Sequence, residues 1–158
     1  MAVHRPLGMA RAFDYGRTMS NAFYLDELTP GQSASRAFAI TDAAIAAFAD
    51  VSTDHNPVHV DEAYALASPF KGRIAHGMLL GAYISATLAS DLPGRGAIYV
   101  SQALNFKRAV RPGDEAEVTV TIADIDLKSG HVTLTTVVKV RNKTMVDGQA
   151  VVIAPKRP

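Results

Sequence analysis

The chain has 158 residues, which is the size of one ordinary domain. Apolar residues make up 48% and charged residues 20% of the sequence, so the chain can form a packed core and is not a disordered segment. The formal net charge of +1 lacks the strong excess of Lys and Arg that is typical of a protein dedicated to nucleic acid. There is no cysteine, which excludes disulfides, thiolate nucleophiles and zinc sites built from thiolates.

The first 22 residues are expected to form an arm ahead of a single domain over residues 23–158. This arm has no continuous apolar stretch of the kind found in a secretory signal. The longest apolar segment, Met78 to Ala89, is shorter than the roughly 17 to 25 residues that a membrane span requires. The sequence therefore predicts a cytoplasmic protein with no membrane partner and, from its charge, no nucleic-acid partner.

In the first part of the domain, polar turns separate one strand pattern from three helical ones. Thr41 is suited to cap the first helix, and Asn56 and Pro57 are typical of the N-cap and first residue of the second. The third helix is apolar on almost every side, so it must be buried. The expected elements are a strand over 32–40 and helices over 42–49, 57–67 and 78–89.

The second part of the domain changes from a helical to a strand pattern. The segments are rich in β-branched residues, and apolar side chains often alternate with polar ones, as in Val118 to Ile122, so strands are predicted over 97–110, 115–127, 131–141 and 145–153. The separators are of turn length and turn type, so we expect consecutive antiparallel hairpins. The sequence thus predicts an α+β fold in which an antiparallel sheet wraps around the helix over 78–89.

The densest polar cluster of the chain spans residues 54–61. A zinc site would pair His55 with His59, but those side chains share one face only inside a continuous helix, which Pro57 interrupts. Acid–base chemistry instead needs a carboxylate and an imidazole close together, and the positive end of a helix favours ionised Asp54 and neutral His59. The alternative is that Asp54 is a turn residue and His59 a surface histidine.

A second candidate site lies at the start of the predicted buried helix. The backbone N–H of Gly77, reinforced by the helix dipole, can bind a carbonyl oxygen that gains negative charge during a reaction. Ser85 follows about two helical turns later on a similar face, where it could contact a ligand. Alternatively, Gly77 only permits close packing of helix on sheet, and Ser85 bonds back to its own helix.

Together these segments resemble a known family, the MaoC-like dehydratases and (R)-specific enoyl-CoA hydratases. Residues 48–65, FADVSTDHNPVHVDEAYA, resemble its hydratase motif, in which an aromatic residue and a polar loop precede Asp-x-Asn-Pro-x-His and a helix. IAHGML, LPGRGAIY and LNFKRAVRPGDE follow in the family's order, and the resemblance covers residues 23–153. Ser52 and Thr53 stand where many members have a glycine, outside the expected catalytic pair.

The resemblance implies a hot-dog fold, assembled as a homodimer or a dimer-based larger oligomer. It also implies addition of water to trans-2-enoyl-CoA to give (R)-3-hydroxyacyl-CoA, or the reverse, with an acyl-CoA thioester as partner. CoA is part of that substrate, so neither a separate cofactor nor a metal is expected. The residues it implies are Asp54 and His59 as the catalytic pair, Gly77 as the N–H donor to the thioester carbonyl and Ser85 as a nearby substrate contact. Asn56 and His76 are expected to support them by hydrogen bonding.

Two other functions remain open on the sequence alone. A hot-dog thioesterase would use a carboxylate and water to cleave the thioester, although the pairing of Asp54 with His59 disfavours it. A protein of another class would bind acyl-CoA without turnover, as a silent subunit does. The intact Asp-x-Asn-Pro-x-His element speaks against that second alternative.

Overall fold

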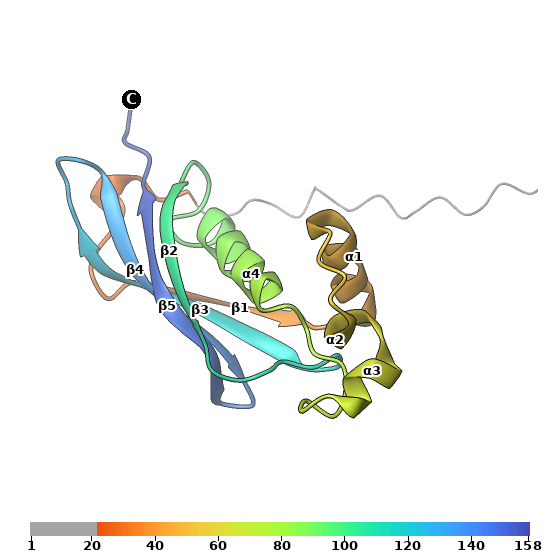
Figure 1. Ribbon diagram of the computed structural model, residues 1–158. Helices are drawn as coiled ribbons and strands as arrows, with labels where there is room; N and C mark the ends of the chain where they lie inside the picture. The colour runs from red at the N-terminus through yellow and green to blue at the C-terminus, as the bar shows by residue number, and fades with distance from the viewer. Residues whose placement is uncertain (1–21) are drawn as a thin grey trace, which may run out of the picture.

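The computed structural model describes residues 22–158, so the arm expected over residues 1–22 lies, apart from Ala22, outside the described residues. One curved sheet holds a central helix, α4, against its face, and three shorter helices lie on the other side of α4 (Figure 1). The helices are α1 (Asp42–Ser52), α2 (Pro57–Val60), α3 (Glu62–Ala67) and α4 (Gly77–Ser90), after a 3-10 turn over Leu25–Glu27. The strands are β1 (Ser33–Ala39), β2 (Ile98–Phe106), β3 (Glu115–Ile125), β4 (His131–Val140) and β5 (Lys143–Ile153).

The sheet is antiparallel throughout, in the order β1-β3-β4-β5-β2. The hairpins expected between β3, β4 and β5 are therefore confirmed. The hairpin expected between β2 and β3 is wrong, because β2 pairs with β5 at one end of the sheet and β1 takes the free edge of β3. Residues 107–114 instead carry the chain across the molecule, and their turn ends beside β1, where Gly113 donates to the carbonyl of Ile40.

The core lies between the sheet and α4, as the sequence predicted. Alternate residues of β3 point inward, and Val118 and Val120 are fully buried. Ile84 and Leu88 of α4 pack in the same cluster. Burying a side chain of this size stabilises a fold by about 1.5 to 3 kcal/mol, so α4 is firmly anchored and its N-terminus is held at a defined place.

The structure corrects two helix boundaries near the polar cluster. The first helix continues to Ser52, three residues beyond the expected end at Ala49, which shortens the polar loop. The second helix, expected over 57–67, is broken at Asp61, whose extended backbone ends α2 and whose side chain accepts from the N–H of Tyr64 to cap α3. A short polar side chain that satisfies a free backbone N–H favours a cap over a helix interior.

No helix within residues 22–158 combines the length and the apolar character needed to cross a membrane.

Candidate active site

The loop between α1 and α2 is shaped by side-chain bonds to its own backbone. Thr53 adopts a left-handed conformation with φ of 60°, which turns the chain out of α1. The Oδ1 atom of Asp54 accepts from the N–H of Asn56 at 3.1 Å, and Asn56 in turn caps α2 at Val58. These bonds hold the exposed Asp54 carboxylate at the wall of a cavity. Asn56 therefore links the loop that carries Asp54 to the start of α2.

His59 lies in α2 and is 8% exposed. Its Nδ1 atom lies 2.8 Å from the carbonyl oxygen of Ile74. A carbonyl only accepts, so Nδ1 carries the proton of this bond, and Nε2 is left as the nitrogen that gains or loses a proton. Since α2 has only four residues, its dipole is weak, and this backbone contact decides the proton position more than the helix end does.

His76 is the residue before α4, is 1% exposed and stacks on His59, with ring centroids 3.9 Å apart. Its Nε2 atom lies 2.9 Å from the carbonyl oxygen of Asp54, so Nε2 is the protonated nitrogen. The Nδ1 atom of His76 is buried with no partner among the described residues. The side chain thus ties the Asp54 loop to α4 and supports the ring of His59.

Gly77 begins α4, and its N–H has no partner within the helix because the first N–H groups of any helix lack one. The ring of Phe106, at the end of β2, lies close by: a Cβ on Gly77 would come 2.7 Å from its Cε1 atom. The absence of a side chain here therefore leaves room for an aromatic ring beside an N–H group that has no partner within α4.

Asp54, His59 and Gly77 line one cavity of about 490 Å³, which we call the catalytic cavity. His76 lines it too, so the structure brings four of the predicted site residues together. The other walls are mostly apolar and suit a ligand with a hydrocarbon part. They include Phe70, Met78, Leu80, Phe106 and Val110, with Lys107 and Arg108 as cations.

Ser85, the predicted substrate contact on α4, does not line the catalytic cavity. It lines a separate cavity of about 420 Å³, which we call the second cavity. The reason is distance along α4, since eight residues correspond to about 12 Å of helix. The second cavity is lined by Phe48 of α1, by Met78, Gly81, Ala82 and Ser85 of α4, and by Tyr99, Gln102 and Leu104 of β2.

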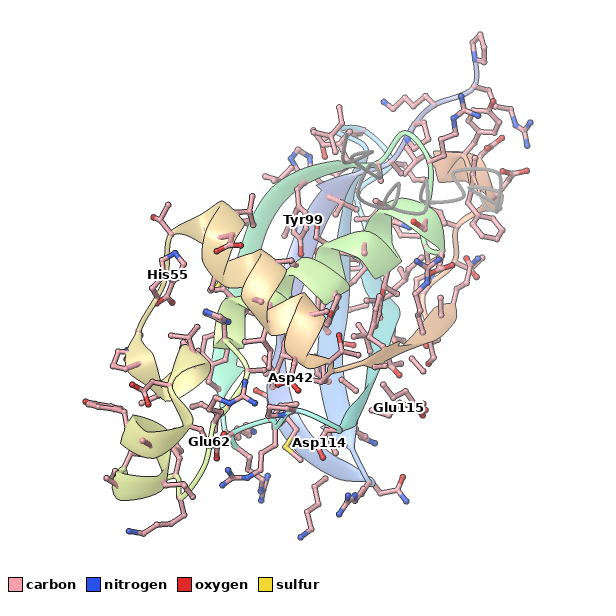
Figure 2. All side chains as sticks on the ribbon, turned by 90° about the vertical axis from the view of Figure 1, so that its right-hand side faces the viewer. Asp42, His55, Glu62, Tyr99, Asp114 and Glu115 are labelled. Carbon is pink, nitrogen blue, oxygen red and sulfur yellow. The ribbon has the colours of Figure 1, made fainter. Side chains whose placement is uncertain are left out.

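Two neighbouring features show how the loop between α1 and α2 is oriented. His55 is exposed and lies at the outer margin of the molecule in Figure 2, away from the cavity. Arg73 donates to Glu62 of α3 and to Asp42 of α1, at 2.8 and 2.7 Å. The hydrogen bond to Glu62, followed by that to Asp42, raises the pKa of Arg73, so this cation stays charged and ties together the helices that flank α2.

Asp54, His59 and His76 also offer donor atoms with a spread of up to 4.8 Å. Ligands of a tetrahedral zinc ion lie about 2.1 Å from the metal, and therefore about 3.4 Å from one another. One nitrogen of each histidine is already bonded to a backbone carbonyl, and the Asp54 carboxylate accepts from the N–H of Asn56. The arrangement fits hydrogen bonding to a shared water better than direct coordination.

Two residues of the cavity walls, Phe106 and Met78, were not predicted as such from the sequence. Phe106 follows an ordinary strand pattern, and only the fold brings it from the end of β2 to the start of α4. Met78 was expected as part of a buried apolar helix and of the segment IAHGML, yet it is 57% exposed and lines both cavities. Phe106 likewise lies in the segment LNFKRAVRPGDE, but neither residue was predicted to line a cavity.

The chain matches the family model described as "MaoC like domain" over residues 27–145. It is 46% identical over 134 residues to an (R)-specific enoyl-CoA hydratase from Rhodospirillum rubrum, covering 85% of this chain and 93% of that protein. It is 37% identical over 125 residues to a mitochondrial 3-hydroxyacyl-[acyl-carrier-protein] dehydratase from Arabidopsis thaliana, covering 77% of this chain and 73% of that protein.

Among solved structures, the unliganded R-hydratase from Pseudomonas aeruginosa superposes with a TM-score of 0.82 at 43% identity. The match covers 86% of this chain and 88% of that one. The expected hot-dog fold is thereby confirmed, with the sheet wrapped around α4. The family model spans most of the chain and includes both motifs, residues 54–59 and 76–78. From these motifs, Asp54, His59, His76, Gly77 and Met78 line one cavity. The chain belongs to the MaoC-like dehydratase family.

Proposed function

We propose that the protein adds water to trans-2-enoyl-CoA to form (R)-3-hydroxyacyl-CoA, and catalyses the reverse dehydration. This proposal rests on one observation: Asp54, His59 and Gly77, the first residue of α4, line the same cavity. Hydration needs a group that deprotonates water and a donor that stabilises negative charge on the thioester oxygen. The relatives from Rhodospirillum rubrum and Aeromonas caviae that bear the name (R)-specific enoyl-CoA hydratase support the same reaction.

Each group has a defined part in this reaction. The N–H of Gly77 donates a hydrogen bond to the thioester oxygen and stabilises the negative charge that develops there, which makes the β-carbon electrophilic. Asp54 and His59 hold one water, and His59 Nε2 is the imidazole nitrogen free to exchange a proton. The hydroxyl group bonds to the β-carbon while the proton passes through the pair to the α-carbon, so atoms and charge balance without a separate cofactor. The two groups act as a unit, whose protonation states are shared.

The direct test is hydration of crotonyl-CoA, followed as loss of enoyl absorbance, with chiral analysis of the product. We expect turnover to (R)-3-hydroxybutyryl-CoA. Release of free CoA from a saturated acyl-CoA, detected with a thiol reagent, would favour thioester cleavage instead. Tight binding of crotonyl-CoA without turnover would favour a silent binding subunit, and either result would contradict the proposal.

Replacement of Gly77 by alanine tests the proposed N–H donor. The new methyl group would lie 2.7 Å from Phe106, whose half-exposed ring must then move into the catalytic cavity. We expect hydration to fall about tenfold, less than when an oxyanion donor is removed altogether. Adding Phe106→Leu should restore part of the loss by making room. Unchanged kcat and KM for Gly77→Ala would contradict this account of the site.

Replacement of His76 by phenylalanine tests its supporting role. The variant keeps a ring to stack on His59 but loses the hydrogen bond to the Asp54 carbonyl. A neutral hydrogen bond is worth about 1 kcal/mol, so we expect kcat to fall about fivefold. The matched control is His55→Phe, which changes an exposed histidine of the same loop and should leave kcat unchanged. Equal activity of the two variants would show that His76 supports nothing essential.

We also propose that two copies of the chain pair through β2. This strand is the end of the sheet beyond β5, so one of its edges is unpaired within residues 22–158. Ile98 and Val100 of this strand are 63% and 49% exposed. Pairing would remove both an open edge and an apolar surface from water. Light scattering should give twice the mass of the chain, or a multiple of that dimer, and a monomer mass would contradict the pairing.

A further inference from the structure

The imidazole of His59 is oriented by the residue that follows Arg73 in the chain. Its Nδ1 atom donates to the carbonyl of Ile74 at 2.8 Å, and the N–H of Ile74 donates to the carbonyl of Val58 at 3.1 Å. The backbone of Ile74 therefore contacts two consecutive residues of α2. If this backbone shifted, Nδ1 would lose its acceptor, and the ring would no longer be held with Nε2 as the nitrogen free to exchange a proton.

Helix α2 depends on its neighbours for its position. Its four residues form little more than one turn, which is not stable on its own. Residues of α1 and α2 also line a cavity of about 230 Å³, which we call the rear cavity. Its lining consists of Asp42, Ile45 and Ala46 of α1, His59 and Val60 of α2, and Arg73. Packing against α1 is therefore incomplete here, and close packing alone does not fix α2 on this side.

Arg73 joins the helices on either side of α2. Its Nη2 atom donates to Oδ1 of Asp42, the first residue of α1, and its Nε atom donates to Oε2 of Glu62, the first residue of α3. Figure 2 shows Asp42 and Glu62 on these two helices. An isolated exposed ion pair stabilises a fold little, but a planar guanidinium that binds two carboxylates holds them in a fixed geometry. The partly buried Arg73 also lines the rear cavity, so this bridge lies where α1 and α2 do not pack closely.

We propose that Arg73 is a positioning residue for the imidazole of His59. The bridge from α1 to α3 fixes the backbone next to Arg73, where the carbonyl of Ile74 holds the ring. The part of this inference that concerns catalysis rests on the proposed hydration of enoyl-CoA. Arg73 does not line the catalytic cavity, so it acts through His59 and not on the substrate. Its effect is therefore expected on turnover and on the proton position of His59 rather than on substrate binding.

Arg73→Met in the full-length protein tests this role, because methionine keeps an unbranched side chain but donates no hydrogen bond. NMR of isotope-labelled histidine in mildly alkaline solution, where histidine is ordinarily neutral, reports which ring nitrogen carries the proton. We expect the proton on Nδ1 of His59 and on Nε2 of His76 in the wild type. In Arg73→Met the His59 ring should become a mixture of both tautomers, while His76 stays unchanged. The His59 signals are identified by their loss in His59→Ala.

Hydration of crotonyl-CoA by the same variant should fall about tenfold in kcat. A misplacement of about 1 Å can cost about a hundredfold, and a ring that is still partly held is expected to cost less. KM should change by less than about twofold, because no wall of the catalytic cavity is altered. Glu62→Gln removes the charge of one partner of Arg73 and should move kcat and the tautomer in the same direction by a smaller amount. This second variant carries the test if Arg73→Met does not fold.

Arg36→Met is the matched control. It also removes an ion pair between arginine and a carboxylate, that of Arg36 with Asp91, but Arg36 lines neither the catalytic cavity nor the rear cavity. Its kcat and its His59 tautomer should be those of the wild type. If the wild type does not hydrate crotonyl-CoA, the proposed function is wrong, and the tautomers still test the positioning of the ring. In an active enzyme, an unchanged kcat or an unchanged tautomer in Arg73→Met would overturn the role of Arg73, as would an equal fall of kcat in Arg36→Met.

Discussion

Asp54→Asn is expected to lose at least about a hundredfold in the rate of crotonyl-CoA hydration, the usual size of a general acid–base contribution. The change is close to isosteric, and an asparagine Oδ1 still accepts from the N–H of Asn56, so the loop keeps its turn. Only the charge and the ability to exchange a proton are lost. His59→Ala should lose as much, because it removes the Nε2 atom that faces the cavity.

Asp50→Asn is the matched control for the carboxylate. Asp50 lies on α1 a few residues before the loop and its side chain is 79% exposed, so its replacement should leave hydration unchanged. The double variant of Asp54 and His59 should be no slower than the worse single one, because groups that act as a unit do not contribute additively. Near-normal hydration by folded Asp54→Asn would rule out the proposed pair.

Gly148→Ala is expected to have the largest effect on stability. Gly148 of β5 faces Leu104 of β2, and a Cβ there would lie 1.8 Å from the carbonyl oxygen of Ala103. The clash is with the backbone of a paired strand, which cannot move without breaking the ladder. We expect the free energy of unfolding in urea to fall by about 3 kcal/mol, the upper range for overpacking.

Gln149, the residue after Gly148, provides the control substitution. Gln149 is exposed on the same strand, so Gln149→Ala should change the free energy of unfolding by less than about 0.5 kcal/mol. An unfolding free energy of Gly148→Ala equal to that of the wild type would mean that β2 and β5 are not in this close register. Loss of β2 would also remove Phe106 from the catalytic cavity, so hydration should fall together with stability.

Interactions between neighbouring residues explain the features that the sequence predicted correctly. Asn56 and Pro57 fix the start of a helix by their own backbone and side-chain preferences, so the relative places of Asp54 and His59 follow from adjacent residues. The apolar character of α4 requires burial, which places the start of that helix inside the domain. The fold class could therefore be derived before the structure, whereas the grouping of Asp54 and His59 with Gly77 was implied by the resemblance to the family.

Contacts between distant segments explain what the sequence did not predict. The partner of β2 is β5, more than 40 residues later, and a turn of hairpin type before β3 gives no sign of this. The bound nitrogen of His59 depends on a carbonyl 15 residues away. Asp61 shows the remaining difficulty, because a residue that fits a helix interior also caps the next helix when the chain bends there.

β2 supplies walls of the catalytic cavity and of the second cavity, while one of its edges is unpaired within residues 22–158. The nine residues of β2 are therefore under two constraints. Their side chains in the cavities must fit the ligand, and the unpaired edge must fit the surface that covers it. A substitution in β2 that tightens the association of two copies would also shift the side chain of Tyr99, Leu104 or Phe106. Assembly and substrate preference are consequently expected to change together as this sequence diverges, and variants designed for one should always be assayed for the other.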